Sequence, residues 1–465
     1  MSNFHPGVSP ASAAEAQPTI GLIGMGAMGK MYAKYLSQAG WKRIHVCDQR
    51  EKYNALKEEY ADRCNITVFP DGHGVARSSD FMIYSVEAEF IERVVAQYGP
   101  STKVNAIVAG QTSVKAPEKD AFEKYLPQDA EIVSCHSLHG PSVSPIGQPL
   151  VLIKHRASDA ALTLVENILR SFGSRFVYLS YDEHDLVTAN TQGVIHAAFL
   201  SMGTAWASRK EYPWEEGSYV GGIETAKVNL TLRIYSNAWH VYAGLAILNP
   251  SARLQIDQYA TSVTELFKLM LAGDSARFRE RVMWARRIVF ESQTEARPPI
   301  LLSGDVLDRF SLGRTPVVGD VPAGDGVPPP TKYKANSHLS LLAMVDCWAQ
   351  LQIKPFLHLS LAATPLFRLF LGVAEHLFRA PAVLDGAIHS AMHDTWHRSD
   401  DLEFVVAARG WSQCVKFGSF DLYRRRFEQT RIFFEGRFEE AGRLGSEMIK
   451  AIMESEVQGE NTTVS

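Results

Sequence analysis

The sequence lacks the cysteine patterns that indicate disulfide bridges or a structural zinc site. Its 465 residues include five cysteines, an odd number, and no two of them are spaced as C-x-x-C. Disulfide-rich secreted domains and zinc ribbons are therefore disfavoured. A reducing compartment suits such a chain best, and we expect a cytoplasmic protein.

Long hydrophobic runs and an excess of one charge are also missing. The most apolar C-terminal run, LSLAATPLFRLFLGVAEHLF, is interrupted by Pro365, Arg368 and Glu375, so we expect no membrane span. The formal net charge is -4 and the basic residues are scattered, which argues against nucleic acid as a partner. Residues 1–18 have neither the apolar core of a signal peptide nor the arginines of a presequence, and we expect a disordered tail.

Short β-branched runs alternate with helical stretches over residues 19–180. Strands of this length separated by helices are typical of a parallel sheet with helical crossovers. The sequence therefore predicts an α/β N-terminal domain of the Rossmann dinucleotide-binding type. Its expected strands are TIGLIG, RIHVCD, FMIYSV, KVNAIVAG, EIVSC, PLVLIK and RFVYLS.

From residue 181 onward the hydrophobic pattern has the 3.6-residue period of helices. We expect a helical substrate-binding and dimerisation domain over residues 181–313. A segment dense in proline and glycine, residues 314–334, is typical of a linker. Residues 335–460 should form a C-terminal helical region, so a large all-α part follows the α/β domain.

The stretch GLIGMGAMG places Gly24, Gly26 and Gly29 between an expected strand and an expected helix. The first glycine permits a tight turn, the second lets backbone N–H groups approach a pyrophosphate, and the third allows close packing of helix on strand. The helix N-terminus adds about half a positive charge. We expect a dinucleotide here, contacted also by Met25 and Met28.

Three further residues are expected near the cofactor. Asp48 ends the second strand, where an acidic residue usually meets the ribose of NAD. Arg50, two residues later, suits the 2′-phosphate of NADP instead, so the residues leave both cofactors open. Ser85 follows the strand FMIYSV and should border the glycine loop.

Polar residues that follow strands of the sheet are candidates for chemistry, because ligands bind outside the carboxyl ends of parallel strands. Ser113 lies in QTSVK, and His136 and His139 lie in HSLHGPSV. A histidine can take a proton at neutral pH, although it can also be structural. Ser113 alone is also consistent with a cap of the following helix.

Two groups of helical histidines have simple structural interpretations as well. Gln192 and His196 are four residues apart and should share one face of a helix that Asp182 could cap. A buried histidine bonded to a backbone carbonyl would look the same. The later series of three histidines at four-residue spacing lacks the H-E-x-x-H pattern, so we expect no metal site; its members are His389, His393 and His397.

These motifs occur together in an order that resembles the prephenate dehydrogenases. The order is GLIGMGAMG, QTSVK, HSLHGPSV, then DEHD with TQGVIHAAFLSMGTAW. The later segments YPWEEGSYVGG and LRIYSNAWHVYAGLAILNPSA resemble the fungal form. The resemblance implies oxidative decarboxylation of prephenate to 4-hydroxyphenylpyruvate, a step towards tyrosine.

The resemblance also implies roles for particular residues. His136 corresponds to the catalytic histidine that contacts the C4 hydroxyl, and Ser113 to the serine that helps to orient it. His196 and Gln192 correspond to substrate-facing positions. The fungal form implies NADP rather than NAD, and the apolar helical half suggests a homodimer.

The sequence departs from the family where the substrate carboxylates need a cation. Many members carry an arginine five residues before the Asn-Pro or Asp-Pro that follows the substrate helix, but this position is Gly244 here. Arg233, earlier on what should be the same helix, is the expected substitute, with Arg253 as second choice.

Other functions remain open from the residues alone. Arogenate differs from prephenate by one amine, so an arogenate dehydrogenase would look alike. A β-hydroxyacid dehydrogenase would need a catalytic lysine that TANTQGVIHAAF lacks. A non-catalytic NADP-binding sensor or scaffold would keep the fold without the chemistry.

Overall fold

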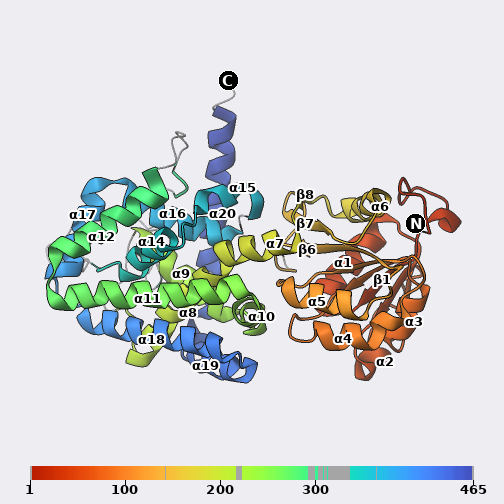
Figure 1. Cartoon of the computed structure of the whole chain (residues 1–465), viewed down its shortest axis with the longest axis horizontal. Coiled ribbons are helices and arrows are strands. Elements are labelled where there is room, and N and C mark those ends of the chain that lie inside the picture. Colours follow the sequence, from red (N-terminus) through yellow and green to blue (C-terminus); the bar gives the residue numbers. More distant parts are fainter. Residues whose placement is uncertain are drawn as a thin grey trace, which may run out of the picture. The chain divides into compact units, whose positions relative to one another are not determined.

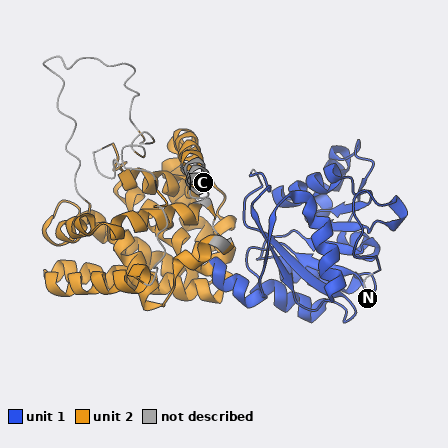
Figure 2. Cartoon of the chain, turned by 90° about the horizontal axis from the view of Figure 1, so that it is seen from above, with its two compact units in different colours: residues 1–188 blue, residues 189–465 orange. Residues whose placement is uncertain are grey.

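The structure is a computed structural model, and it describes residues 3–141, 143–215, 222–291, 299–301, 307, 310, 312, 336–362 and 364–462. The chain divides into two compact units, residues 1–188 and 189–465 (Figure 2). The expected linker at 314–334 lies outside the described residues. None of the described helices has the length and apolar content needed to cross a lipid bilayer.

Unit 1 is built on an eight-stranded sheet in the order β3-β2-β1-β4-β5-β6-β7-β8 (Figure 1). The strands from β3 across to β6 are parallel, β7 is antiparallel to β6, and β8 is parallel to β7. The strands are β1 (Ile20–Ile23), β2 (Ile44–Cys47), β3 (Ile66–Val68), β4 (Phe81–Tyr84), β5 (Ile107–Gly110), β6 (Glu131–Ser137), β7 (Pro149–Lys154) and β8 (Arg175–Tyr178).

Helices cover this sheet, as in other parallel sheets whose central strands are apolar on both faces. The central strands β1, β4 and β5 are buried at every residue. The parallel order and the helical crossovers give the Rossmann-type architecture that the sequence predicts. The helices are α1 (Ala27–Ala39), α2 (Tyr53–Glu59), α3 (Gly72–Ser78), α4 (Ile91–Tyr98), α5 (Ala116–Tyr125), α6 (Asp159–Leu169) and α7 (Tyr181–Thr188).

The N-terminal segment packs onto unit 1, and the expectation of a disordered tail is wrong for residues 3–18. Val8 is 7% exposed and belongs to the core of this unit. The buried Gln17 side chain donates hydrogen bonds to the carbonyl oxygens of Pro10 and Ser12 at 3.0 and 2.9 Å. One apolar anchor and one amide thus order a segment whose average composition is typical of disorder.

Unit 2 is helical and has one core. Helices on both sides of the undescribed segment contribute to it, so the expected substrate domain and C-terminal region share their buried side chains. The helices are α8 (Val194–Arg209), α9 (Gly222–Ser236), α10 (His240–Leu248), α11 (Pro250–Ala272), α12 (Ser275–Arg286), α14 (Leu339–Gln350), α15 (Leu359–Ala362), α16 (Pro365–Arg379), α17 (Pro381–His393), α18 (Arg398–Phe417), α19 (Phe420–Phe434) and α20 (Phe438–Thr462).

The helix α8 lies at the centre of unit 2, packed against α9 and α18. Its sequence is apolar on nearly every face, which is typical of a buried helix. A π-helical segment, Ala189–Gly193, precedes it. Single π-helical turns often occur at functional sites.

Candidate active site

A tight turn between β1 and α1 carries the three glycines of the predicted loop. Gly24 has a φ of 101°, which L side chains rarely adopt. A Cβ added at Gly29 would lie 2.1 Å from the carbonyl oxygen of Gly24, so glycine is required there too. A Cβ added at Gly26 would meet no heavy atom within 4 Å. The backbone at Gly26 therefore faces open space from which a ligand can approach.

The two methionines of this loop face the protein. Met25 is 2% exposed, and its backbone N–H donates to Oδ2 of Asp48 at 3.2 Å. Met28 is partly buried against the core of unit 1. Both side chains support the loop from inside.

The carboxylate of Asp48 is already engaged by the protein. Besides the bond from Met25, it accepts the N–H of Gln49 at 2.7 Å, and the Lys52 ammonium lies 3.5 Å away. The Arg50 side chain is exposed. At the same edge of the sheet, the N–H of Ser85 donates to the carbonyl of Ile23 at 2.8 Å. Ser85 therefore borders the glycine loop, as predicted from its place after β4.

His136, on β6, forms a chain of side-chain contacts in unit 1. Its Nδ1 lies 2.8 Å from Nε2 of His184 on α7, and Nδ1 of His184 lies 2.9 Å from Oδ1 of Asp185. The Asp185 carboxylate also accepts the backbone N–H groups of Lys115 and Ala116 at 2.7 and 2.8 Å. One carboxylate therefore joins the histidine pair to the N-terminus of α5.

Burial keeps both histidines of this chain uncharged at neutral pH. It lowers the pKa of His136 well below the usual 6.5, and the neighbouring His184, Lys115 and His139 lower that pKa further. Burial also lowers the pKa of His184, although its hydrogen bond to Asp185 opposes the change. A neutral imidazole has one nitrogen able to accept a proton, so His136 can act as a base.

A buried ion pair joins the ends of β5 and β6 beside His136. Lys115 and Glu118 are both fully buried, with Nζ and Oε2 2.9 Å apart. The ammonium also donates to the carbonyl oxygens of Gly110 and Cys135, each at 2.9 Å. Removing one member would leave a buried charge unpaired at a cost of about 3–5 kcal/mol. The pair therefore holds the strand that carries His136.

Ser113 lies between these elements, in the turn from β5 to α5, and is partly buried. The expectation that it caps α5 is wrong, because the N-cap position is Lys115 and the Asp185 carboxylate accepts the first N–H groups. Among the hydrogen bonds of the described residues, the partner of His136 is His184 and not Ser113.

A direct contact also links the glycine-loop helix to the strand of His136. The Tyr32 hydroxyl on α1 lies 2.8 Å from Oγ of Ser137, which follows His136 on β6. Both groups are buried. The loop and the histidine are thus held in one rigid part of unit 1.

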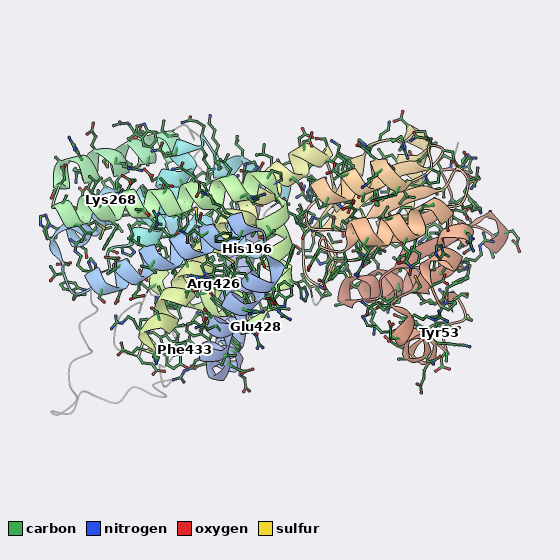
Figure 3. All side chains as sticks on the ribbon, turned by 60° about the horizontal axis from the view of Figure 1, so that its bottom comes forward. Tyr53, His196, Lys268, Arg426, Glu428 and Phe433 are labelled. Carbon is green, nitrogen blue, oxygen red and sulfur yellow. The ribbon has the colours of Figure 1, made fainter. Side chains whose placement is uncertain are left out.

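Unit 2 holds the other predicted residues. His196, on α8, is 9% exposed, and its buried Nδ1 has no hydrogen-bond partner among the described residues (Figure 3). Its ring packs edge-on against Tyr242 with centroids 4.8 Å apart. Burial raises the pKa of Tyr242, and the Arg233 cation is near enough to oppose that rise. His196, Tyr242 and Arg233 therefore lie in one neighbourhood.

Several details of unit 2 differ from expectation. Arg233 is on α9 and Gly244 on α10, so they do not share a helix. Gln192, partly buried, belongs to the π-helical segment before α8, which alters its expected four-residue spacing to His196. Arg253, the alternative cation, is exposed.

The expected helix cap in unit 1 is also corrected. Asp182 does not cap α7, since its side chain is 90% exposed. Ser180 does: its Oγ accepts the N–H of Glu183 at 3.2 Å, and the Glu183 carboxylate accepts the N–H of Ser180 at 2.7 Å. This capping box was visible in the sequence as S-x-x-E.

The three spaced histidines belong to different elements. The helix α17 ends at His393, and His397 lies before α18, where its Nδ1 is 2.7 Å from Asp401. The rings of His389 and His393 pack with centroids 4.6 Å apart. Within the part of the chain that the structure describes, no three His, Cys, Asp or Glu side chains are arranged to hold a metal ion.

The site contains residues to which the sequence analysis gave no catalytic role. His184 and Asp185 lie within DEHD, and Lys115 within QTSVK, both motifs that the analysis singled out. Their connection spans 48 residues between His136 and His184, so no local pattern contains it. A buried His-Asp dipeptide beside a motif would have been the available signal.

Comparison with known proteins matches both halves of the chain. Residues 193–454 match the family model of a 6-phosphogluconate dehydrogenase C-terminal domain. Residues 19–109 match the model described as NADP oxidoreductase coenzyme F420-dependent.

Curated relatives cover nearly the whole chain. A probable prephenate dehydrogenase [NADP(+)] from Schizosaccharomyces pombe is 51% identical, with 94% of this chain and 98% of that protein covered. The prephenate dehydrogenase [NADP(+)] of Saccharomyces cerevisiae is 49% identical, with 94% and 95% covered. A crystal structure of prephenate dehydrogenase from Aquifex aeolicus is 18% identical, with a TM-score of 0.46 and 57% and 94% covered.

Proposed function

The chain belongs to the NADP(+)-dependent prephenate dehydrogenases, and from that premise we propose which of its residues carry out the reaction. The reaction is the oxidative decarboxylation of prephenate to 4-hydroxyphenylpyruvate. The observation that carries the assignment of residues is the neutral, buried His136 at the carboxyl end of β6.

His136 is the general base. Its Nδ1 is occupied by His184, which leaves Nε2 to accept the proton of the C4 hydroxyl as C4 becomes a carbonyl carbon. Loss of CO₂ from C1 then makes the ring aromatic, so the step is effectively irreversible. Base assistance of this kind is worth ~100- to 10,000-fold in rate. Ser113, in the turn beside Lys115, orients the same hydroxyl.

The glycine loop fits a dinucleotide, because the backbone at Gly26 is open while Gly24 and Gly29 satisfy the turn and the packing. NADP, when bound, accepts the hydride that leaves C4. Since the Asp48 carboxylate is engaged by two backbone N–H groups, Arg50 is the group that meets the 2′-phosphate. Ser85 lines the same turn.

The substrate carboxylates are bound in unit 2. Arg233 supplies the cation, and His196 offers the buried Nδ1 that has no partner among the described residues. Gln192 faces the substrate from the π-helical segment. Buried polar groups without a partner are costly, so a ligand group that bonds Nδ1 of His196 would recover that cost.

The test is the absorbance of reduced nicotinamide with purified protein, each of prephenate and arogenate, and each of NADP and NAD. We expect turnover with prephenate and NADP, and much weaker turnover with the other three pairs. Faster turnover of arogenate would assign the other substrate. Cofactor binding without turnover of either substrate would identify a sensor or scaffold.

Two properties of the whole protein are part of the proposal. The five cysteines are free thiols, which supports a cytoplasmic location. Large apolar side chains are exposed on α18 and α19, among them Val406, Phe417 and Ile432, which supports a homodimer. Light scattering should give twice the chain mass of 51.6 kDa, and a monomer mass would contradict the dimer. A fluorescent fusion should show diffuse cytoplasmic signal, and signal confined to an organelle would contradict the location.

A further inference from the structure

The histidine pair and Asp185 are connected in a way that fixes where each proton lies. The Asp185 carboxylate has only acceptors, and three donors reach it: the N–H groups of Lys115 and Ala116, and Nδ1 of His184. Nδ1 of His184 must therefore carry a proton. Because burial keeps this ring neutral, its Nε2 then has a lone pair and no proton.

The same reasoning passes to the next ring. Nε2 of His184 is an acceptor, so Nδ1 of His136, 2.8 Å away, must be the donor. Neutral His136 then has its only lone pair on Nε2. The position of one carboxylate thus determines which nitrogen of His136 can accept a proton.

We propose that His184 and Asp185 are a positioning pair that holds His136 in the Nδ1–H tautomer and fixes the turn carrying Ser113. The inference rests on the proposed function of His136 as the base. It adds two residues that do not touch the substrate and act through His136.

The pair also serves the charged state of the base. When the hydroxyl proton of the substrate moves to Nε2, His136 carries both ring protons and a positive charge. That charge lies one ring away from the Asp185 carboxylate, which remains ionised because backbone N–H groups hold it. The proton leaves from Nε2 to water after product release, so the pair ends each turnover unchanged.

The second contact of Asp185 concerns the serine. Its carboxylate accepts the N–H groups of Lys115 and Ala116, which directly follow the Ser113-Val114 turn. The Lys115 side chain is fixed in turn by Glu118 and by the carbonyl of Cys135. The end of this turn is therefore held by the group that sets the tautomer of His136.

The first test is Asp185→Asn. An asparagine amide has one acceptor and one donor end, so it cannot accept all three protons, and an NH₂ group facing His184 reverses both tautomers. In hydrolase triads the same carboxylate-to-amide change lowers kcat about 10,000-fold through the wrong tautomer. We expect kcat to fall at least 100-fold, with affinity for NADP unchanged.

The matched control is Asp182→Asn, the same chemical change on the same helix at a side chain that is 90% exposed. It should keep wild-type kcat. Near-normal kcat in Asp185→Asn would overturn the proposal. Loss of activity in Asp182→Asn as well would show a general effect on α7 and would also overturn it.

A second measurement reads the tautomer without activity. In protein labelled with ¹⁵N-histidine, the ring signals of His136, assigned by their absence in His136→Asn, should show a protonated Nδ1 and an unprotonated Nε2. Asp185→Asn should exchange the two signals. An unprotonated Nδ1 in the wild-type protein, or no exchange in the variant, would refute the tautomer role.

A third comparison applies even if Asp185→Asn fails to fold. His184→Gln offers an amide oxygen to Nδ1 of His136, whereas His184→Leu offers none. We expect the glutamine variant to stay within about 10-fold of wild-type kcat and the leucine variant to lose at least 100-fold. Equal kcat in the two would overturn the proposal. If His136→Asn itself is active, the proposed base is wrong, which is a separate outcome.

Discussion

The polar residues of the two units are arranged in opposite ways. In unit 1 the buried polar groups bond to one another, from His136 through His184 to Asp185, and from Lys115 to Glu118. In unit 2 the buried Nδ1 of His196 has no partner among the described residues. The first arrangement is complete without a ligand, and the second is not.

This difference fits two tasks. A base must keep one tautomer through every turnover, and a closed network of hydrogen bonds provides that rigidity. A binding residue must have unused capacity for its ligand, and an unpartnered buried nitrogen provides it at a cost in stability. The comparison therefore separates residues expected to affect kcat from residues expected to affect KM.

The largest expected effect is that of His136→Asn. Removal of the base should lower kcat by ~100- to 10,000-fold, because the hydroxyl proton then has no acceptor. Isothermal titration should show unchanged NADP affinity, since the glycine loop is untouched. A kcat within a few-fold of wild type would place the chemistry outside the network of unit 1.

The next effect is that of Arg233→Ala in unit 2. Loss of a charge-assisted hydrogen bond to a carboxylate costs about 1.5–3 kcal/mol, so KM for prephenate should rise roughly 10- to 100-fold with a smaller change in kcat. Steady-state kinetics of Arg253→Ala, on the exposed face of α11, serve as the control. A raised KM in Arg253→Ala alone would move the carboxylate site to Arg253.

Arg50→Ala should change cofactor choice by a smaller factor. The exposed arginine contributes to the 2′-phosphate alone, so kcat/KM should fall about 10-fold for NADP and little for NAD. Arg63→Ala, another exposed arginine of unit 1, should leave both values unchanged. An equal loss with the two cofactors would show that Arg50 does not meet the 2′ position.

The smallest effect is on stability and isolates the unpartnered His196. Burial lowers its pKa from 6.5 to about 3, so below pH 6.5 the unfolded chain binds a proton that the folded chain does not. Stability is therefore lost as the pH falls from 6.5 towards 3. Between pH 6.5 and 5.5 the loss is about 1 kcal/mol.

Urea unfolding of unit 2, followed by tryptophan fluorescence at both pH values, measures this loss. His196→Phe should remove about 1 kcal/mol of the difference, because phenylalanine does not titrate. His240→Phe, at an exposed histidine, should keep it. An unchanged pH difference in His196→Phe would show that the ring is not held neutral by burial.

The sequence predicted the parts of unit 1 that follow local rules. The glycines of the β1 to α1 turn, the strand of His136 and the Rossmann-type order all rest on spacing within short segments. The strand β3 was not predicted, since its three residues, Ile66–Val68, are too few to show a period. The fold of residues 3–18 was missed because Val8 and Gln17 act through distant partners.

The candidate site was predictable only where a motif carried it. His136 and Ser113 came from motifs, whereas the His184 and Asp185 contacts depend on bringing α7 beside β6 and the start of α5. The segment DEHD was examined for a helix cap, and its two buried residues were given no catalytic role. Charge and tautomer in a buried network are properties of the folded chain, so composition and spacing do not contain them.

The central claim is that His136 acts as a neutral base whose pKa is lowered by burial. The pH profile of kcat/KM with prephenate and NADP tests it most directly, because that ratio reports ionisations of the free enzyme. We predict a level profile from neutral pH down to 6.5, and an acid limb that falls only below 6.5. An acid limb that already falls above pH 6.5, or one that persists in His136→Asn, would contradict the account.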